Sequence, residues 1–354
     1  MMSKIIFGEQ ITLDSWLKSA DNAEASKQAS KQASKQASKQ ASKLASKQAS
    51  KQASSALDHE FLLQDRIQKI QQITNQYGID NFYISYSGGK DSTVLSALID
   101  LALPDNEIPR VYANTGIELN MIRDFVFELA EHDDRIVILK PSKPIRQMLE
   151  EKGYPFKSKA HAKWVDYYQR NGRTQSIENY LGSDKRDKDL YRTCPKILQY
   201  QFTEENKLRI SDKCCVELKE KPLENWAKSN GKKYNINGVM AEEGGRRSIS
   251  KCLAFYGNKL KFFQPMSVIT KEWEDWFIET YNVQICDIYK PPYNFVRTGC
   301  KGCGFALYLQ KELDTLEQFF PEERKQCELI WKPLYDEYRR LGYRLKKPYC
   351  SDTN

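Results

Sequence analysis

The stretch that decides the fold is NFYISYSGGKDSTVLSALIDLAL, residues 81–103. It begins with NFYISY, an aromatic and β-branched run that is typical of a buried strand. It ends with STVLSALIDLAL, an apolar run that predicts a helix closed by Pro104. Between them SGGKDS, residues 87–92, interrupts the apolar pattern. The polar loop therefore lies at the carboxyl end of a strand, where open α/β sheets bind ligands.

The residue types in this loop suit a phosphate group. The N-terminus of a helix offers unpaired N–H groups and a partial positive charge, and glycines let the backbone approach an anion closely. Hydroxyls donate hydrogen bonds, a lysine adds charge, and a carboxylate here would hold Mg²⁺. We predict a nucleotide site at Ser87, Gly88, Gly89, Lys90, Asp91 and Ser92, with Lys90 and Asp91 as catalytic residues and Mg²⁺ near Asp91. The spacing differs from the Walker A motif, and the alternative is an ordinary Gly-Gly turn.

The pattern around this loop alternates between strands and helices. Alternation of this kind indicates βαβ units and hence a twisted parallel sheet with helices on both faces. We expect an α/β fold of Rossmann-like type, followed by a helical C-terminal part. The predicted strands are 81–86, 110–116, 135–141 and 234–240, and the predicted helices are 57–77, 92–103, 119–132, 143–153, 270–283 and most of 305–342.

The chain of 354 residues carries a low-complexity repeat near its start. Residues 25–54 repeat the tetrapeptide ASKQ and hold seven lysines and no acid, so the net charge of +8 falls to +1 outside them. The basic character is therefore no evidence for a nucleic-acid-binding face. We predict a short N-terminal segment (1–24), a linker (25–54), a main domain (57–320) and a C-terminal helical extension (321–354).

The sequence shows neither an apolar run of 18 residues nor the apolar core of a signal peptide. We therefore expect a cytoplasmic protein that does not cross a membrane.

Nine cysteines in such a chain are not expected to form a disulfide framework. Cys214 and Cys215 are adjacent, and Cys300 and Cys303 form a Cys-x-x-Cys pair. Four thiolates suffice for a [4Fe–4S] cluster or for a tetrahedral zinc ion. Adjacent cysteines are strained around one zinc ion, which favours the cluster. The alternative is that all four are ordinary buried cysteines.

Three further groups of residues are candidates for ligand binding. Glu242, Arg246 and Arg247 follow the strand predicted at 234–240. We predict Arg246 and Arg247 as catalytic residues that clamp phosphate or sulfate, and the alternative is a solvated charged loop. Thr115 and Gly116 end another strand and either contact the nucleotide or form an ordinary turn. Residues 156–173 mix lysines and arginines with aromatics, which suits either a nucleic-acid-binding surface or a helix with aromatic core residues.

These pieces resemble one family. SGGKDS resembles the PP-loop of the adenine-nucleotide α-hydrolase superfamily, and YANTGIEL (112–119) and NGVMAEEGGRRS (237–248) are similar to elements of its phosphoadenosine phosphosulfate (PAPS) reductase branch. ISDKCCVELKEKPL (210–223) and TGCKGCGF (298–305) resemble the cysteine elements of iron–sulfur adenylyl-sulfate reductases. The resemblance runs from about residue 80 to residue 320. It implies nucleotide contacts also at Thr115, Gly116, Glu118 and Glu242, and a cluster on Cys214, Cys215, Cys300 and Cys303.

The resemblance implies an enzyme of sulfur metabolism that binds ATP or a PAPS-type or adenylyl-sulfate (APS) nucleotide with Mg²⁺. The first loop is intact and the chain lacks the Glu-Cys-Gly-Leu-His tail of true PAPS reductases, so cleavage of ATP at the α-phosphate is favoured. The alternatives are sulfur transfer onto nucleic acid, non-catalytic nucleotide binding, and a thioredoxin-dependent reductase whose mobile cysteine would be Cys350. The sequence leaves open the sulfur acceptor, a homo-oligomer and the purpose of the repeat.

Overall fold

The computed structural model describes residues 57–140, 143–182, 193–243, 245–257 and 259–347. The chain divides into two compact units, residues 1–64 and 65–354, and the boundary falls inside a helix that spans residues 57–77. The predicted N-terminal segment, the ASKQ repeat and Cys350 lie outside the described residues.

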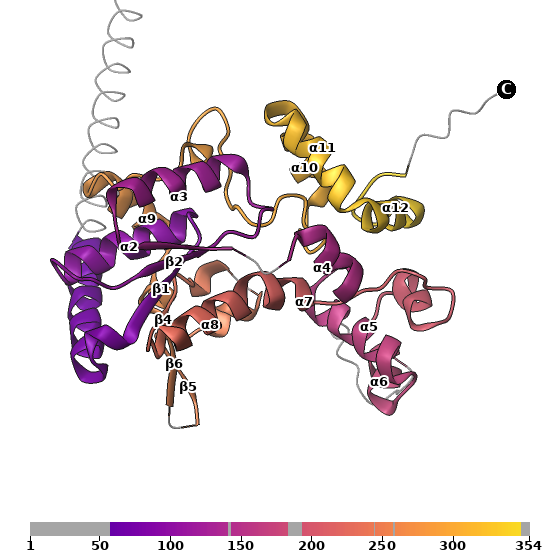
Figure 1. Ribbon diagram of the computed structural model, residues 1–354, viewed down its shortest axis with the longest axis horizontal. Coiled ribbons are helices and arrows are strands. Elements are labelled where there is room, and N and C mark those ends of the chain that lie inside the picture. The colour runs from indigo at the N-terminus through magenta and orange to yellow at the C-terminus, as the bar shows by residue number, and fades with distance from the viewer. Residues whose placement is uncertain (1–56, 141–142, 183–192, 244, 258, 348–354) are drawn as a thin grey trace, which may run out of the picture. The chain divides into compact units, whose positions relative to one another are not determined.

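The second unit is built on a six-stranded sheet with the order β3-β2-β1-β4-β6-β5 (Figure 1). Every neighbouring pair is parallel except β5 and β6, which are antiparallel. The predicted parallel sheet is thus confirmed, and an unpredicted hairpin extends its outer edge. The strands are β1 (Phe82–Tyr86), β2 (Arg110–Ala113), β3 (Ile136–Leu139), β4 (Tyr234–Ile236), β5 (Leu253–Tyr256) and β6 (Lys259–Phe263).

Helices cover both faces of the sheet, as predicted. On one face, α2 (Lys90–Ala102) and α3 (Asn120–His132) lie over β1 and β2, where Tyr86, Tyr112 and Val126 form a small core (Figure 1). On the other face, α8 (Lys221–Ser229) packs through Ala227 against Tyr83 and Val111. Alternate residues of a strand point to opposite faces, so Tyr83 and Tyr86 serve the two different cores.

The helix predicted from residue 270 is α9, Lys271–Thr280. Its N-cap is Thr270, because the Thr270 side chain accepts a hydrogen bond from the amide of Trp273. The buried Trp273 and Phe277 rings stack with 5.0 Å between their centroids.

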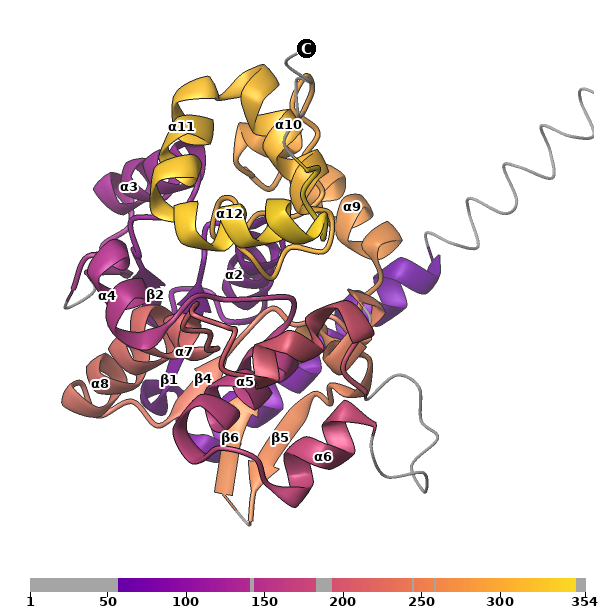
Figure 2. The same cartoon turned by 90° about the vertical axis from the view of Figure 1, so that its right-hand side faces the viewer.

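The rest of the unit is largely helical (Figure 2), and among the described residues its hydrophobic core is larger than the two cores on the sheet faces. This core joins helices from the middle of the chain to the C-terminal helices through residues such as Phe156, Trp331 and Tyr338. The predicted helical C-terminal part is therefore confirmed. The helices are α4 (Ile145–Lys152), α5 (Lys159–Asn171), α6 (Gln175–Leu181), α7 (Lys213–Cys215), α10 (Leu309–Phe319), α11 (Pro321–Ile330) and α12 (Lys332–Leu341).

In the part of the chain that the structure describes, no helix combines the length and the apolar character needed to span a bilayer.

Candidate nucleotide site and cysteine cavity

The loop between β1 and α2 has the geometry that the sequence predicted. Gly89 is the N-cap of α2, and Gly88 has a φ of +68°. A β-carbon on Gly88 would lie 2.5 Å from Cγ2 of Val126, so α3 leaves no room for a side chain there. Glycine at this position lets the loop turn tightly beneath the helix N-terminus.

The two serines of the loop are bonded to each other. The Ser87 and Ser92 hydroxyl oxygens are 3.0 Å apart, and the Ser87 hydroxyl also accepts a hydrogen bond of 3.3 Å from the Gly89 amide. Ser92 donates back to the Gly89 carbonyl oxygen at 2.9 Å. These hydrogen bonds hold the loop in shape. The two hydroxyls and the first-turn amides of α2 lie at the same place, where they can donate hydrogen bonds to an anion.

The Lys90 ammonium is paired with carboxylates instead of pointing into the loop at 87–92. Its Nζ atom is 2.9 Å from the Glu274 carboxylate and 2.9 Å from the Asp275 carboxylate, both on α9. Burial opposes the charge on Lys90, but the two acids outweigh it and raise the pKa of the ammonium. The side chain therefore ties the start of α2 to α9.

Glu274 is completely buried, and burial raises the pKa of its carboxyl to about 7. The negative charge of Asp91 adds to this shift, whereas Lys90 opposes it. Asp275 is 63% exposed and keeps Lys90 paired in either protonation state of Glu274. Sequence reasoning missed this acid pair, because nothing in the helical pattern of α9 marks it.

A cavity of about 190 Å³ opens beside the loop, at the carboxyl ends of β1 and β2. Glu118 and Lys219 lie on its wall together with Ser87, and Thr298 and Gly299 come from the cysteine loop. The structure thus brings Ser87 of the predicted phosphate loop (residues 87–92) and the residues just before Cys300 to one cavity. Tyr289, which the sequence did not single out, hydrogen-bonds Thr298 at this wall, and burial raises the Tyr289 pKa to about 12.

Thr115, Gly116 and Glu118 form a tight turn after β2. The Glu118 carboxylate accepts hydrogen bonds from the Thr115 hydroxyl at 2.6 Å and from the Thr115 amide at 3.1 Å. Gly116 has a φ of +75°, which closes the turn. Of the three, Glu118 lines the cavity.

The segment after β4 contains the predicted site residues Glu242, Arg246 and Arg247. Glu242 accepts a hydrogen bond of 2.6 Å from the amide of Lys271, so its carboxylate lies at the N-terminus of α9. Arg247 lies in a short 3₁₀ helix, Gly245–Ile249. The Arg246 side chain lies outside the described part, and phosphate binding by both arginines stays a prediction.

The four predicted cysteine ligands line one small cavity. Cys214 and Cys215 form most of α7, and Cys300 and Cys303 belong to the loop before α10. Ile117, Ile145, Leu218, Lys219 and Trp331 complete the lining. Among the described residues, no three His, Cys, Asp or Glu side chains converge closely enough to hold a metal ion. The four thiols surround a space without meeting at one point.

The thiols differ in their environments. A hydrogen bond between the two thiols raises the pKa of Cys214 and lowers that of Cys215. Burial raises the pKa of both Cys300 and Cys303. A group bound here must therefore supply positive charge to keep the thiols ionised.

Lys219 connects the two cavities, because it lines both. It lies in a π-helical turn, Val216–Glu220, directly after the paired cysteines, and π-helical turns are frequent at functional sites. Burial opposes its charge, but Cys300 and Glu118 outweigh this effect and raise the Lys219 pKa. The spacing of four residues from Cys215 places both on one helix face and was the available sequence signal.

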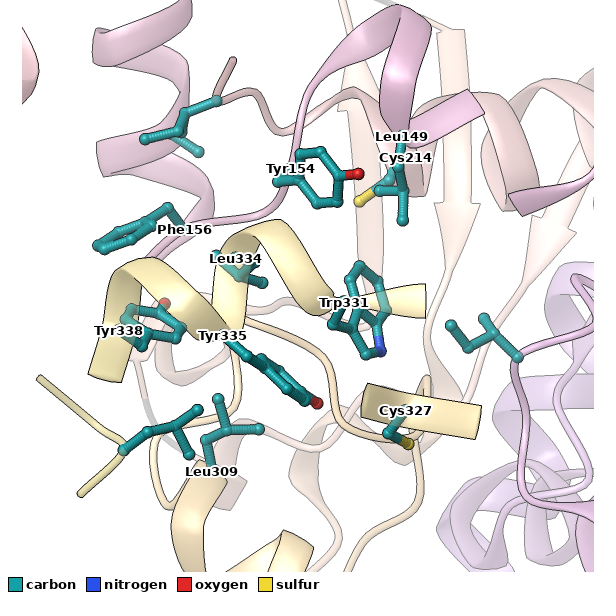
Figure 3. Packing of buried hydrophobic residues seen from close by; sticks show 14 of the residues in the cluster. Leu149, Tyr154, Phe156, Cys214, Leu309, Cys327, Trp331, Leu334, Tyr335 and Tyr338 are labelled. Atoms are coloured by element: carbon teal, nitrogen blue, oxygen red, sulfur yellow. The ribbon is translucent and has the colours of Figure 1, made fainter. Parts of the chain in front are cut away.

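The C-terminal helices hold the Cys-x-x-Cys loop in place. Tyr335 donates its hydroxyl to the carbonyl oxygen of Gly302 at 2.6 Å, and Tyr338 donates to that of Gly304 at 2.7 Å. The indole N–H of Trp331 donates to the Lys301 carbonyl oxygen at 3.0 Å. Figure 3 shows these three aromatic side chains among the buried residues of the large core. Residues after 320 are thus part of the site.

Lys301 lies between Cys300 and Cys303 in the sequence, but its ammonium is paired with a carboxylate. It is buried and forms an ion pair of 2.9 Å with the buried Glu323 of α11. Lys219, by contrast, hydrogen-bonds the Cys300 thiol.

The basic and aromatic stretch at 156–173 is mainly structural. Phe156 is fully buried, and Trp164 stacks on Tyr180 with 5.7 Å between ring centroids. Arg170 is paired with Asp166 at 2.7 Å, and Arg173 with Glu178 at 3.2 Å. Of the two interpretations of this stretch, the structure favours the helix with core aromatics.

Residues 81–187 match the family model of the phosphoadenosine phosphosulfate reductase domain. No curated protein is similar enough to the chain to count as a match.

Several solved structures resemble the chain at low similarity. A phosphoadenylyl-sulfate reductase from Candida auris in a phosphate complex is 13% identical over 61% of this chain and 82% of its own, with a TM-score of 0.35. A U34-tRNA thiolase from Methanococcus maripaludis with its [4Fe–4S] cluster is 14% identical over 78% and 80%, with a TM-score of 0.32. An NH₃-dependent NAD synthetase from Campylobacter jejuni in complex with a nitrate ion is 11% identical over 78% and 93%, with a TM-score of 0.35.

The matched residues 81–187 contain β1, the loop at 87–92 and the turn at Thr115, so the match falls on the part that carries the candidate nucleotide site. This part of the chain is thus similar to the phosphoadenosine phosphosulfate reductase domain.

Proposed function

We propose that the protein is a PP-loop enzyme that binds ATP and breaks the bond between its α- and β-phosphates. The observation that carries this proposal is the loop at the end of β1. There the Gly89 N-cap, the Ser87 and Ser92 hydroxyls and the first-turn amides of α2 lie beside a cavity of about 190 Å³. Such a loop offers donors to phosphate oxygens without a large rearrangement.

The residues have distinct roles in this proposal. The first-turn amides and the serine hydroxyls bind the phosphates and stabilise the charge that develops as the bond breaks. Asp91 holds Mg²⁺, which neutralises phosphate charge when bound. Because Lys90 is already paired with two carboxylates, we assign it to holding α2 against α9. Glu118 and Lys219 contact the remainder of the nucleotide or the group it activates.

We infer that the four cysteines would hold a [4Fe–4S] cluster rather than a zinc ion. Cys214 and Cys215 are successive residues of a helix, so their side chains leave the helix axis about 100° apart. Two such thiolates reach different iron atoms of a cluster more readily than one ion. A cluster bound there would supply redox or sulfur-binding chemistry, and Lys219 would stand between it and the nucleotide. We assign Cys214, Cys215, Cys300 and Cys303 as its ligands.

Pyrophosphate release tests this function. Anaerobically purified protein incubated with ATP and Mg²⁺ is expected to form AMP or an adenylate together with pyrophosphate. Asp91→Asn should lower the rate by at least about tenfold while leaving the fold intact, because the substitution removes the Mg²⁺ ligand but keeps the side-chain shape. Asp275→Asn is the matched control on the exposed carboxylate of α9 and should keep most of the rate. Wild-type protein that binds ATP and releases no pyrophosphate would be a nucleotide sensor.

The rival reductase function has its own signature. It requires PAPS or adenylyl-sulfate as the substrate, a thioredoxin-like reductant and sulfite as the product. Parallel incubations with ATP and with PAPS separate the two functions, because only the first yields pyrophosphate without a reductant.

A further inference from the structure

The β5–β6 hairpin carries a basic and aromatic surface that the nucleotide site does not use. Residues 244–263 contain five lysines and arginines and no acid. The hairpin lies at the outer edge of the sheet, because β5 has a partner strand on one side only. Figures 1 and 2 both show the two strands projecting past the helices that cover the sheet.

One face of this hairpin gathers the exposed groups. Tyr256 is directly opposite Lys259 in the strand register, and Lys261 follows two residues later on the same face. The Tyr256 side chain is 82% exposed. Lys259 and Lys261 are also exposed. We call these three residues the hairpin face.

The lysines of this region have no acidic partners in the described part of the chain. Lys251, Lys259 and Lys261 form no ion pair with a described residue, and the Lys261 ammonium lies 5.2 Å from the Phe262 ring centroid. By contrast, the lysines and arginines of the 156–173 stretch are mostly paired with carboxylates. The positive charge of the hairpin is thus available to an external anion.

An exposed ring opposite Lys259, on a face that also carries Lys261, has the chemistry of a single-stranded nucleic-acid site. Lysines contact successive phosphates, while a tyrosine offers a flat surface on which a base stacks, whatever its identity. An acidic peptide would use the lysines but not the ring. We propose that the hairpin face binds single-stranded nucleic acid.

The end of the hairpin that is farthest from Tyr256 lies at the edge of the sheet that carries the candidate nucleotide site. Because β6 runs parallel to β4 and β4 to β1, the carboxyl end of β6 lies at the same edge of the sheet as the phosphate loop. From Lys259 to Phe263 is four residues, or about 13 Å along the strand. Lys251, just before β5, continues the basic surface at that edge. Use of the bound strand as the acceptor of the activated group rests on the proposed function, whereas its binding does not.

Fluorescence anisotropy with a labelled single-stranded oligonucleotide of mixed sequence tests the proposal on the full-length protein. Tyr256→Ala should weaken binding by about tenfold, because one stacked base is lost. The double variant Lys259→Glu/Lys261→Glu should weaken it by more than tenfold. It should also make the slope of log affinity against log salt shallower by about 1.4, which corresponds to two lost phosphate contacts.

Two controls match these variants in residue type and net charge. Tyr308→Ala removes a tyrosine that is 73% exposed elsewhere. Lys228→Glu/Lys311→Glu reverses two exposed lysines on α8 and α10. Both controls should bind the oligonucleotide within about twofold of the wild type, since surface charge far from the contact is screened by salt.

Two results would overturn the proposal. One is that the hairpin variants bind like their controls. The other is that polyglutamate displaces the oligonucleotide while Tyr256→Ala binds it as tightly as the wild type, which would indicate an acidic protein partner. ATP binding by the same variants separates the two proposals. Loss of oligonucleotide with ATP retained belongs to the hairpin alone, whereas a wild type that binds the oligonucleotide but never ATP contradicts only the proposed function.

Discussion

The phosphate loop and the cysteine cavity lie side by side but are built in opposite ways. The phosphate loop is made by one continuous stretch, β1 to α2, and its hydroxyls bond within the loop itself. The cysteine cavity draws on α7, the loop of Cys300 and the C-terminal helices, whose aromatic side chains bond that loop from outside. A site made locally depends on its own residues, whereas a site assembled from distant segments depends on the packing of each.

The largest expected effect tests the composition of the cysteine cavity. Cys303→Ser should reduce iron from about four atoms per chain to less than about one, because a cluster loses one of its four ligands. Iron and sulfide counts after anaerobic purification measure this. Cys286→Ser is the control, since Cys286 is also buried but bonds the carbonyl oxygen of Met121 outside the cavity. Equal iron contents in Cys303→Ser and Cys286→Ser would show that Cys303 is not a ligand.

The dependence on distant packing can be tested at Gly302. Its φ is +63°, and a β-carbon would lie 2.3 Å from the Tyr335 hydroxyl and 2.9 Å from the Cys327 sulfur. Gly302→Ala should therefore lower the free energy of unfolding by about 2–5 kcal/mol, from backbone strain and overpacking together. Urea denaturation measures the change. Gly299→Ala, where a β-carbon would meet no atom within 4 Å, should stay within about 0.5 kcal/mol.

The free energy of unfolding should depend on pH through the buried side chain of His161. Burial lowers the pKa of His161 from 6.5 to about 4, and its ring bonds Tyr180 and Gln201. His161 binds a proton below about pH 6.5 in the unfolded chain, whereas in the folded chain it stays neutral down to about pH 4. Stability should therefore fall by up to about 3 kcal/mol as the pH drops from 6.5 to 4.

The matched variants for this effect are His161→Gln and His132→Gln. The first should lose most of the slope of unfolding free energy against pH between 4 and 6.5. The second changes an exposed histidine and should keep it. A wild-type slope that survives in His161→Gln would place the responsible group elsewhere.

The smallest effect concerns Lys90 in the phosphate loop. Because its ammonium already has two carboxylate partners, Lys90→Met should weaken ATP binding by less than about tenfold, while the amides of α2 remain. Isothermal titration calorimetry with ATP and Mg²⁺ measures this. A loss of a hundredfold or more would return Lys90 to the phosphate-binding role that the sequence predicted for it.

The contrast between the two regions explains what the sequence could predict. Strand, loop and helix at 81–103 were predictable because a few local signals, the apolar runs and the paired glycines, specify them. For the cysteine cavity, spacing alone identified the four cysteines that the structure brings together. It did not reveal that Tyr335 and Tyr338 hold their loop, because those contacts join residues 33 and 34 positions apart.

Other features were missed for the same physical reason. The acids that hold Lys90 lie about 185 residues further along the chain, and only the fold brings α9 to α2. The β5–β6 hairpin was not predicted because its strands are short and one has an irregular register at Ala254 and Phe255. Lys219 belongs to the cysteine element at 210–223, but its position between the two cavities depends on the π-helical turn.

The central claim is that the phosphates of an adenine nucleotide bind at the N-terminus of α2. A crystal structure with Mg²⁺ and an ATP analogue that resists cleavage between its α- and β-phosphates tests it most directly. We expect phosphate oxygens within about 3 Å of the Gly89 amide and the hydroxyls of Ser87 and Ser92. An analogue bound elsewhere, with this loop still closed by its own serine hydrogen bonds, would contradict it.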